Sequence, residues 1–253
     1  MKKQNKFIII MPCYNVSKWV GLNLEILKHQ SYTNFECHII NDGSSDNSED
    51  IILKNIEEDN RFFYYGNKKR TGSSLYNYYT TFHKIKPNPE DIIIWLDGDD
   101  WLSSVFVLQY LNEFYNTTGC WMTYGTYQIF PTGQDGSHHC VEIPIEVHQN
   151  RAYRQWVHVY SHLRTHKAFL FYNLKESDLI DSRSNKFYTE ATDCAYLFSL
   201  AEMCSSPEKI RLIDDILLVL NRTNPNQAAG NLEKQKATEA HIRSLQSFSK
   251  YEI

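Results

Sequence analysis

The feature that most constrains this chain is a short apolar stretch that runs directly into three acidic residues. The stretch covers residues 92–96, and the sequence continues with Asp97-Gly98-Asp99-Asp100. Consecutive apolar residues that begin with β-branched isoleucines predict a short strand buried on both faces. Three carboxylates at the end of such a strand repel one another unless a cation lies between them.

The acidic turn suggests a site for a hard divalent cation. Gly98 allows a tight turn, so Asp97 and Asp99 can point toward one position in space. Asp100 follows directly. Carboxylate oxygens in this arrangement suit Mn²⁺ or Mg²⁺, which commonly bind one or two carboxylates together with substrate phosphates. The alternative is a solvated Asp-Gly turn that caps the following helix.

The order of the expected elements predicts an α/β fold. Strands are expected at residues 7–11, 35–40, 62–65 and 92–96, and helices at about 17–30 (capped by Ser17), 47–58 and 73–85. This alternation predicts a parallel sheet with right-handed crossovers, in which ligands bind beyond the carboxyl ends of the strands. Three polar turns, residues 12–15, 41–46 and 97–100, are therefore expected to meet at one edge of the sheet.

The second half of the chain is less regular. A strand is expected at 121–130, an inserted loop at 131–150, a strand-like or buried segment at 168–172, a helix at 189–203, and a strand region at 212–220 interrupted by Asp214-Asp215. Residues 224–253 are polar with a weak helical period, which predicts a tail or a mobile flap. The expected organisation is one domain over residues 1–223 followed by this tail.

Composition and charge exclude several classes of protein. The net charge of −4 argues against nucleic acid as a partner. No apolar run reaches the length of about 18 residues that a transmembrane segment needs, and the run after the basic N-terminus is too short for a signal peptide. A cytoplasmic protein is therefore expected. The six cysteines are widely spaced without a C-x-x-C pair, which favours free thiols. The oligomeric state has no signal in the sequence.

Four segments together carry a resemblance to a known family. They are Ile9-Ile10-Met11-Pro12-Cys13-Tyr14-Asn15, Ile39-Ile40-Asn41-Asp42-Gly43-Ser44-Ser45-Asp46, Trp95-Leu96-Asp97-Gly98-Asp99-Asp100 and, more weakly, Thr192-Asp193 at the start of an apolar helix. Over about residues 6–222 the chain resembles the inverting glycosyltransferase family 2, and the third segment resembles its DxD motif. The resemblance implies a GT-A (Rossmann-like) fold with a mainly parallel twisted sheet, a nucleotide-sugar-binding half (1–125) and an irregular acceptor and catalytic half (126–223).

The resemblance also implies roles for individual residues. The base and ribose of a nucleotide-sugar, commonly a UDP-sugar, would be bound by Pro12, Tyr14, Asn15 and Asp42. Asp97 and Asp99 would hold the ribose and a divalent metal, with Gly98 between them and Asp100 adjacent. Asp193 would be the general base, and Glu190 is a rival for that role. In the basic loop after the third strand, Arg70 is the candidate cation for the nucleotide.

Three histidines recur every four residues, so on a helix His158, His162 and His166 would share one side. One interpretation is a zinc site, and another is an exposed basic helix. In the third, residues 161–167 resemble a segment that lines the donor site in some family members. Arg164 would then face the diphosphate, and His162 the metal or the sugar.

The resulting hypothesis is a metal-dependent inverting glycosyltransferase. It would move a hexose from a UDP-sugar, with UDP-glucose or UDP-galactose favoured, to a hydroxyl of a polysaccharide, lipid-linked or protein-bound acceptor. Such a reaction needs a base for the acceptor hydroxyl and charge stabilisation for the leaving diphosphate. The alternatives are a non-catalytic nucleotide-sugar or carbohydrate-binding protein and a sugar-nucleotide pyrophosphorylase, although no Gly-rich loop follows the first strand as the latter requires.

Overall fold

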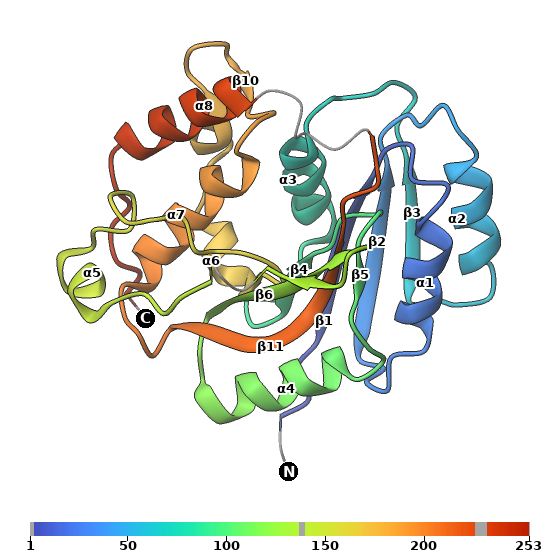
Figure 1. Cartoon of the computed structure of the whole chain (residues 1–253), viewed down its shortest axis with the longest axis horizontal. Helices are drawn as coiled ribbons and strands as arrows, with labels where there is room; N and C mark the ends of the chain where they lie inside the picture. The colour runs from blue at the N-terminus through green and yellow to red at the C-terminus, as the bar shows by residue number, and fades with distance from the viewer. Residues whose placement is uncertain (1–2, 137–139, 226–231, 253) are drawn as a thin grey trace.

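The computed structural model describes residues 3–136, 140–225 and 232–252, and a curved sheet runs through the middle of them (Figure 1). The strands are β1 (Phe7–Cys13), β2 (Phe35–Asn41), β3 (Phe62–Gly66), β4 (Ile92–Trp95), β5 (Trp101–Leu102), β6 (Met122–Phe130), β7 (Gln134–Asp135), β8 (Thr165–Lys167), β9 (Ile180–Asp181), β10 (Lys186–Phe187) and β11 (Ile210–Asn221). The helices are α1 (Val20–Lys28), α2 (Ser48–Ile56), α3 (Ser74–Ile85), α4 (Val107–Thr118), α5 (Ile145–Asn150), α6 (Ala168–Tyr172), α7 (Thr192–Cys204) and α8 (Leu232–Ser244). Within the described residues the sheet has nine strands in the order β3-β2-β1-β4-β8-β6-β11-β5, with β7 paired to β6; β9 and β10 pair separately.

The first half of the sheet is built as the sequence predicts. β1 pairs in parallel with both β2 and β4, so Phe7 lies between Phe35 and Ile92. β2 in turn pairs in parallel with β3. The expected α/β fold with a mainly parallel sheet is confirmed, and the three polar turns follow the carboxyl ends of β1, β2 and β4.

The start of α1 differs from the prediction. Ser17 is not its cap, because the helix begins at Val20 with Trp19 at the N-cap and no capping side chain. The backbone N–H of Ser17 instead donates to Asp46 Oδ2 at 3.1 Å. Ser17 therefore ties the turn after β1 to the turn after β2.

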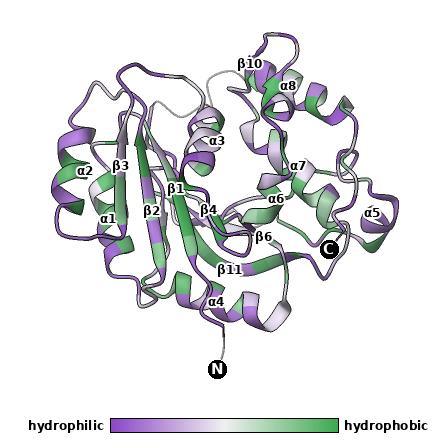
Figure 2. Ribbon diagram, turned by 180° about the vertical axis from the view of Figure 1, so that it is seen from behind, coloured by the Kyte–Doolittle hydropathy of each residue, from purple (hydrophilic) through white to green (hydrophobic). Residues whose placement is uncertain are grey.

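The two faces of the sheet bury different helices because side chains alternate along each strand. In β1, Phe7, Ile9 and Met11 pack in the cluster that contains α1 and α4, whereas Ile8 and Ile10 pack in the cluster that contains α3, α6 and α7. Figure 2 shows the strands as a largely hydrophobic centre with polar segments on the outer helices. Since both faces of the sheet are covered, its polar chemistry is concentrated at the strand ends.

The second half of the chain changes direction through one short strand. β8 lies between β4 and β6 and is antiparallel to both, whereas β11 is parallel to β6. β11 runs continuously across Asp214-Asp215, with register shifts between Ile213 and Leu218. The predicted interruption is therefore a bulge within one strand.

Three expectations for this half need correction. Residues 168–171 are buried, as one alternative stated, but Tyr172 is exposed and the segment forms helix α6 rather than a strand. The expected loop at 131–150 contains β7 and α5, and its residues 137–139 lie outside the described residues. The histidines share no helix, because His166 lies in β8 while His158 and His162 lie in the irregular segment before it.

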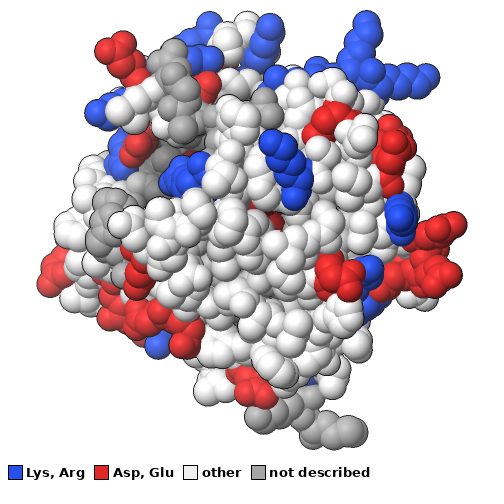
Figure 3. Space-filling view, turned by 45° about the vertical axis from the view of Figure 1, so that its right-hand side comes forward, with Lys and Arg blue, Asp and Glu red and all other residues white. Residues whose placement is uncertain are grey.

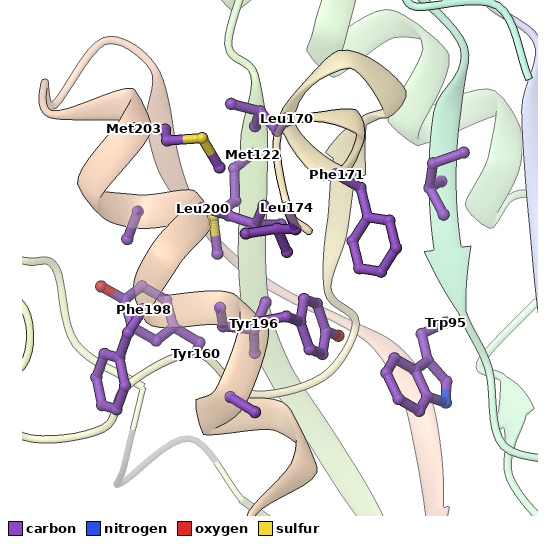
Figure 4. Packing of buried hydrophobic residues seen from close by; sticks show 14 of the residues in the cluster. Trp95, Met122, Tyr160, Leu170, Phe171, Leu174, Tyr196, Phe198, Leu200 and Met203 are labelled. Carbon is purple, nitrogen blue, oxygen red and sulfur yellow. The ribbon is translucent and has the colours of Figure 1, made fainter. Parts of the chain in front are cut away.

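Helix α7 is buried along nearly its whole length, and this burial fixes its first turn. Every residue from Cys194 to Cys204 is buried. Figure 4 shows Tyr196, Phe198, Leu200 and Met203 of this helix packed among side chains of the surrounding elements. The Tyr196 ring stacks on Trp95 of β4, with centroids 5.2 Å apart. Asp193, one residue before this buried run, is thereby held near the end of β4.

The C-terminal region contains an anchored helix. Ile242 of α8 is buried in the same hydrophobic cluster as α7. Arg154 forms a buried ion pair with Glu202 of α7 at 2.7 Å and donates to the Ile242 carbonyl at 2.6 Å. The backbone N–H of Phe248 donates to the same Glu202 carboxylate at 2.9 Å. Residues 232–252 therefore pack against the body of the fold.

The expectation of a separate tail or flap after residue 223 stays a prediction, because residues 226–231 lie outside the described residues. Among the described residues, no helix combines the length and the apolar character that crossing a membrane requires.

Candidate active site

A cavity of about 1010 Å³ opens where β1, β2 and β4 end. Its walls come from the three polar turns, the loop before α3, the segments before β8 and α7, the end of β11 and the start of α8. Eleven of the thirteen candidate residues line it: Pro12, Tyr14, Asp42, Arg70, Asp97, Asp99, Asp100, His162, Arg164, Glu190 and Asp193. Asn15 and Gly98 are not among the lining residues.

The three carboxylates after β4 all reach this cavity. Each accepts a hydrogen bond from the protein: Asp97 Oδ1 from Trp95 Nε1 at 3.2 Å, Asp99 Oδ2 from Asn224 Nδ2 at 2.8 Å, and Asp100 Oδ1 from the Asn221 backbone N–H at 2.8 Å. Within the described part of the chain, no donor reaches Oδ2 of Asp97 or of Asp100. Both oxygens are therefore available to a cation.

Burial and mutual repulsion disfavour the charged forms of these carboxylates. Burial, followed by the charge of Asp99, raises the pKa of Asp97 to about 6. Burial, followed by the charges of Asp97 and Asp99, raises the pKa of Asp100 well above its usual range. Asp99 and Asp100 are only 8% and 2% exposed. The alternative of a solvated turn is therefore wrong, and a bound cation would relieve the repulsion.

Gly98 is required by a close approach rather than by an unusual backbone angle. A Cβ at this position would lie 2.4 Å from Cys13 Sγ. The backbone N–H of Gly98 donates to the Pro12 carbonyl at 3.1 Å. The absence of a side chain thus lets the acidic turn pack directly against the turn after β1.

Asp42 organises the loop that precedes α3. Its carboxylate accepts from Asn67 Nδ2 at 2.9 Å, from the N–H and hydroxyl of Thr71 at 2.9 and 3.0 Å, and from the N–H of Gly72 at 3.1 Å. Burial opposes ionisation of Asp42, but these donors outweigh it and lower its pKa. Asp42 therefore lines the cavity while holding the loop that carries Arg70.

Three more of the nucleotide candidates lie near the cavity in different surroundings. The Arg70 guanidinium lies over the Tyr14 ring, 3.7 Å from its centroid, and both line the cavity. Asn15 has a left-handed backbone, and its Oδ1 accepts from the Ser45 N–H at 2.8 Å. The structure thus brings Arg70 and Tyr14 to the cavity, while Asn15 braces the turn after β2.

Asp193 lies at the first turn of α7 and contacts the partly buried cation of Arg164. Its Oδ2 lies 3.2 Å from Arg164 Nη1 and 3.9 Å from His158 Nε2, and its Oδ1 accepts from the Cys194 N–H at 2.9 Å. Burial raises the pKa of Asp193, but the opposing effects of His158 and Arg164 lower it to about 2. Burial also lowers the pKa of His158. His158 and Arg164 together therefore favour the ionised form of Asp193 in spite of its burial.

Arg164 joins the base candidate to His162. Its Nη2 donates to His162 Nε2 at 2.8 Å, and burial lowers the pKa of His162 well below its usual range. A neutral imidazole accepts this bond. The Nε atom of Arg164 and Nε2 of His158 are buried without a hydrogen-bond partner among the described residues. Buried unpaired polar atoms beside a carboxylate are typical of a place that a ligand fills.

The zinc interpretation of the three histidines is wrong. His166 accepts from or donates to the Tyr78 hydroxyl at 2.9 Å, in a buried position outside the cavity lining. Potential ligand atoms of His158, Asp193 and Cys194 do lie within 4.8 Å of one another. The Arg164 guanidinium beside Asp193, however, repels a further cation at this point.

Glu190 lines the cavity just before α7. Its Oε1 lies 3.6 Å from Lys234 Nζ on α8, and its Oε2 is buried without a partner among the described residues. Gln235, next to Lys234, also lines the cavity. No signal in the sequence identifies these two α8 residues, because they lie in a polar segment after an element boundary. Asn224, the partner of Asp99, was missed for the same reason.

Similar proteins support one family. The model of "Glycosyl transferase family 2" matches residues 8–172. The glycosyltransferase GlyA of Streptococcus pneumoniae is 30% identical over 107 residues, which cover 42% of this chain and 15% of GlyA. The chain spans well under two thirds of the length of the curated relatives that it matches.

Solved structures show the same fold at low sequence identity. S. aureus TarS 1-349, solved with UDP-GlcNAc, aligns with a TM-score of 0.61 and 16% identity, over 87% of this chain and 59% of TarS. The mannosyltransferase PcManGT of Pyrobaculum calidifontis, solved with GDP-Man and Mn²⁺, aligns with a TM-score of 0.59 and 14% identity, over 97% of this chain and 66% of PcManGT. The expected GT-A fold is confirmed.

Proposed function

The chain belongs to glycosyl transferase family 2, and from this premise we propose that it is a metal-dependent inverting glycosyltransferase that uses a nucleoside diphosphate sugar. The observation that carries the proposal is that one cavity holds carboxylates on two sides. Asp97, Asp99 and Asp100 follow β4, whereas Asp193 begins α7 beside Arg164. Sugar transfer needs charge stabilisation at the leaving group and a base at the acceptor.

The donor would lie along the ends of β1, β2 and β4. Pro12, Tyr14 and Asp42 would bind the base and ribose, and Asn15 would act indirectly by bracing the turn after β2. Figure 3 shows Lys and Arg side chains along the upper edge of the molecule, where Figure 1 places the loop before α3 and the start of α8. Such charges attract an anionic nucleotide.

The diphosphate would lie near the arginines of the cavity. Arg164 interacts electrostatically with both Asp193 and Asp97, and it donates a hydrogen bond to His162. Arg222, at the end of β11, lines the same cavity. We propose a UDP-sugar as donor, with UDP-glucose or UDP-galactose favoured. TarS was solved with UDP-GlcNAc and PcManGT with GDP-Man, so these donors belong in any test.

The three carboxylates of the acidic turn fit a divalent cation as ligands. Asp97, Asp99 and Asp100 are hard oxygen ligands, and burial, followed by the charges of the neighbouring aspartates, raises the pKa values of Asp97 and Asp100. We propose that these three residues hold Mn²⁺ or Mg²⁺. When bound, such an ion supplies stabilisation of the negative charge on the leaving diphosphate.

Asp193 would act as the general base. The acceptor hydroxyl gives its proton to the Asp193 carboxylate while its oxygen bonds to the anomeric carbon, and the bond from that carbon to the diphosphate breaks. Asp193 is ionised, as this role requires. A single displacement inverts the anomeric centre. Glu190 remains the rival base, although it is paired with Lys234 rather than Arg164.

The acceptor would be a hydroxyl of a polysaccharide, a lipid-linked sugar or a protein-bound sugar. The family assignment argues against the alternatives of a pyrophosphorylase and a non-catalytic binding protein. The experiment is a nucleotide-release assay over UDP-glucose, UDP-galactose, UDP-GlcNAc and GDP-mannose, with Mn²⁺ and with EDTA. We expect Mn²⁺-dependent release from one UDP-sugar. Equal release in excess EDTA, or binding of every donor without release, would contradict the proposal.

A further inference from the structure

The first turn of α8 forms part of the cavity that contains Asp193. Gln235 lines the cavity, and Lys234 lies 3.6 Å from Glu190. Residues three and four apart share one side of a helix, so Gln235, Thr238 and Ile242 lie on the same side of α8. Thr238 and Ile242 are 4% and 1% exposed. The inward side of α8 therefore continues from the core into the cavity wall.

The position of this wall is set by contacts outside the cavity. Arg243 Nη1 donates to the backbone carbonyls of Arg154 and Trp156, both at 2.6 Å, and its other nitrogen pairs with Glu239 at 2.6 Å. These contacts hold the C-terminal half of α8, and the buried Thr238, one turn after Gln235, continues this packing toward the cavity. A preformed wall of this kind suits recognition of a substrate.

Glu190 has one carboxylate oxygen that the described residues do not satisfy. Oε1 lies near Lys234, whereas Oε2 is buried without a hydrogen-bond partner. A buried acceptor without a partner costs free energy, so native structures fill such positions with a bound donor. The missing hydrogen-bond partner of Glu190 Oε2 is therefore a group that carries O–H or N–H.

We propose that Glu190, Gln235 and Lys234 form an acceptor subsite for a neutral sugar with neighbouring hydroxyls. One hydroxyl donates to Glu190 Oε2, and the next bonds to the Gln235 amide, which can both donate and accept. A further hydroxyl of the same sugar then meets Asp193. Lys234 holds the Glu190 carboxylate in place. This inference rests on the proposed function.

The charges near this subsite disfavour an anionic acceptor. Glu190 and Asp193 are both carboxylates, and the nearby ammonium of Lys234 already faces Glu190. Asp193 is likewise paired with Arg164, so a phosphate placed here would meet two carboxylates whose neighbouring cations are already engaged. The subsite therefore predicts binding of a neutral glycoside in preference to a polyol phosphate.

Binding of small acceptors to the full chain tests the inference. Methyl β-glucoside, methyl β-galactoside and methyl α-mannoside are compared with glycerol 1-phosphate by saturation-transfer NMR, in the presence of UDP and Mn²⁺. We expect at least one glycoside to bind and glycerol 1-phosphate not to bind. Gln235→Ala and Glu190→Ala should each weaken binding of that glycoside about 10- to 100-fold. This is the loss of affinity expected for one hydrogen bond in a buried site.

Matched variants separate recognition from structure. Lys236→Ala removes an exposed lysine from the same turn of α8 and should leave glycoside binding unchanged. Glu190→Gln keeps the size and one acceptor oxygen, so it should recover part of the binding lost in Glu190→Ala. For a glycoside that accepts sugar, both Glu190 variants should raise KM more than they lower kcat.

Separate outcomes distinguish the two proposals. If UDP binds by calorimetry but no glycoside binds, or if Gln235→Ala and Glu190→Ala bind the glycoside as the wild type does, the subsite is wrong while the donor site stands. If glycerol 1-phosphate alone binds, the acceptor class is wrong. If no nucleotide binds and no sugar nucleotide is turned over, the proposed function itself fails.

Discussion

The Arg164 guanidinium lies 3.2 Å from the Asp193 carboxylate, measured from Nη1 to Oδ2. This contact links the proposed leaving-group side of the cavity to the proposed base. Together with His158, it keeps Asp193 ionised in spite of its buried surroundings, which on their own raise its pKa. The same ion pair weakens Asp193 as a proton acceptor, so the contact should loosen when the diphosphate of a donor attracts Arg164.

The pH dependence of transfer tests this contact. The pKa of Asp193 is about 2, and the base must be ionised, so protonation of Asp193 should cause no loss of kcat between pH 8 and pH 5. Arg164→Met removes one of the two main charges that oppose the effect of burial and leaves His158, so the pKa of Asp193 should rise. We expect an acidic limb to appear in the kcat profile of the variant, measured at saturating donor and Mn²⁺. Profiles of the same shape for both proteins would contradict the role of Arg164.

Removing a carboxylate from the acidic turn should stabilise the metal-free protein and weaken metal binding. Asp100 has a pKa well above its usual range because of burial and its neighbours Asp97 and Asp99. Asp100→Asn removes one charge and keeps an acceptor for the Asn221 N–H. In metal-free buffer at pH 7, the variant should melt a few degrees higher than the wild type. Mn²⁺ should raise the melting temperature of the wild type and have a smaller effect on the variant; an equal effect on both would remove Asp100 from the metal site.

Asp42 should strengthen binding of the nucleotide through the loop that it holds. Asp42→Ala leaves the donors of Asn67, Thr71 and Gly72 without their acceptor. We expect UDP affinity to fall by about 1–3 kcal/mol, together with a lower melting temperature. Asp42→Asn is the matched control. Because it keeps one acceptor oxygen, its UDP affinity should lie between those of the wild type and of Asp42→Ala. Unchanged calorimetric affinity for UDP in Asp42→Ala would contradict the assignment.

The choice between the two candidate bases rests on kcat. Asp193→Asn keeps the volume of the side chain but removes proton acceptance, so kcat should fall by a factor on the order of 10² to 10⁴ while UDP still binds. Glu190→Gln should instead act mainly on KM for the acceptor. If Glu190→Gln loses kcat by such a factor and Asp193→Asn does not, the base is Glu190.

The sequence predicts the donor side of this site better than the acceptor side, for a physical reason. Asp42 and Asp97 follow apolar strands with clear periodicity, and parallel strands bring their carboxyl ends to one edge of a sheet. Arg164 and Asp193 meet only because β8 is antiparallel to β4 and because α7 is buried against Trp95. Neither relationship has a local pattern.

The same limit applies to α8. Ile242 is the one large apolar residue that α8 buries, and Arg154 and Glu202 hold the helix through contacts between distant parts of the chain. The weak helical period of this segment does not reveal the tertiary contacts that support the helix. Residues such as Gln235 become candidates only once that packing is known.

The configuration of the first sugar released tests the central claim most directly. The UDP-sugar that gives nucleotide release is incubated with the enzyme in water, where water takes the place of the acceptor, and the product is followed by proton NMR before its anomers equilibrate. A single displacement with Asp193 as base predicts that an α-linked UDP-sugar first yields the β anomer. Initial release of the α anomer would contradict the mechanism.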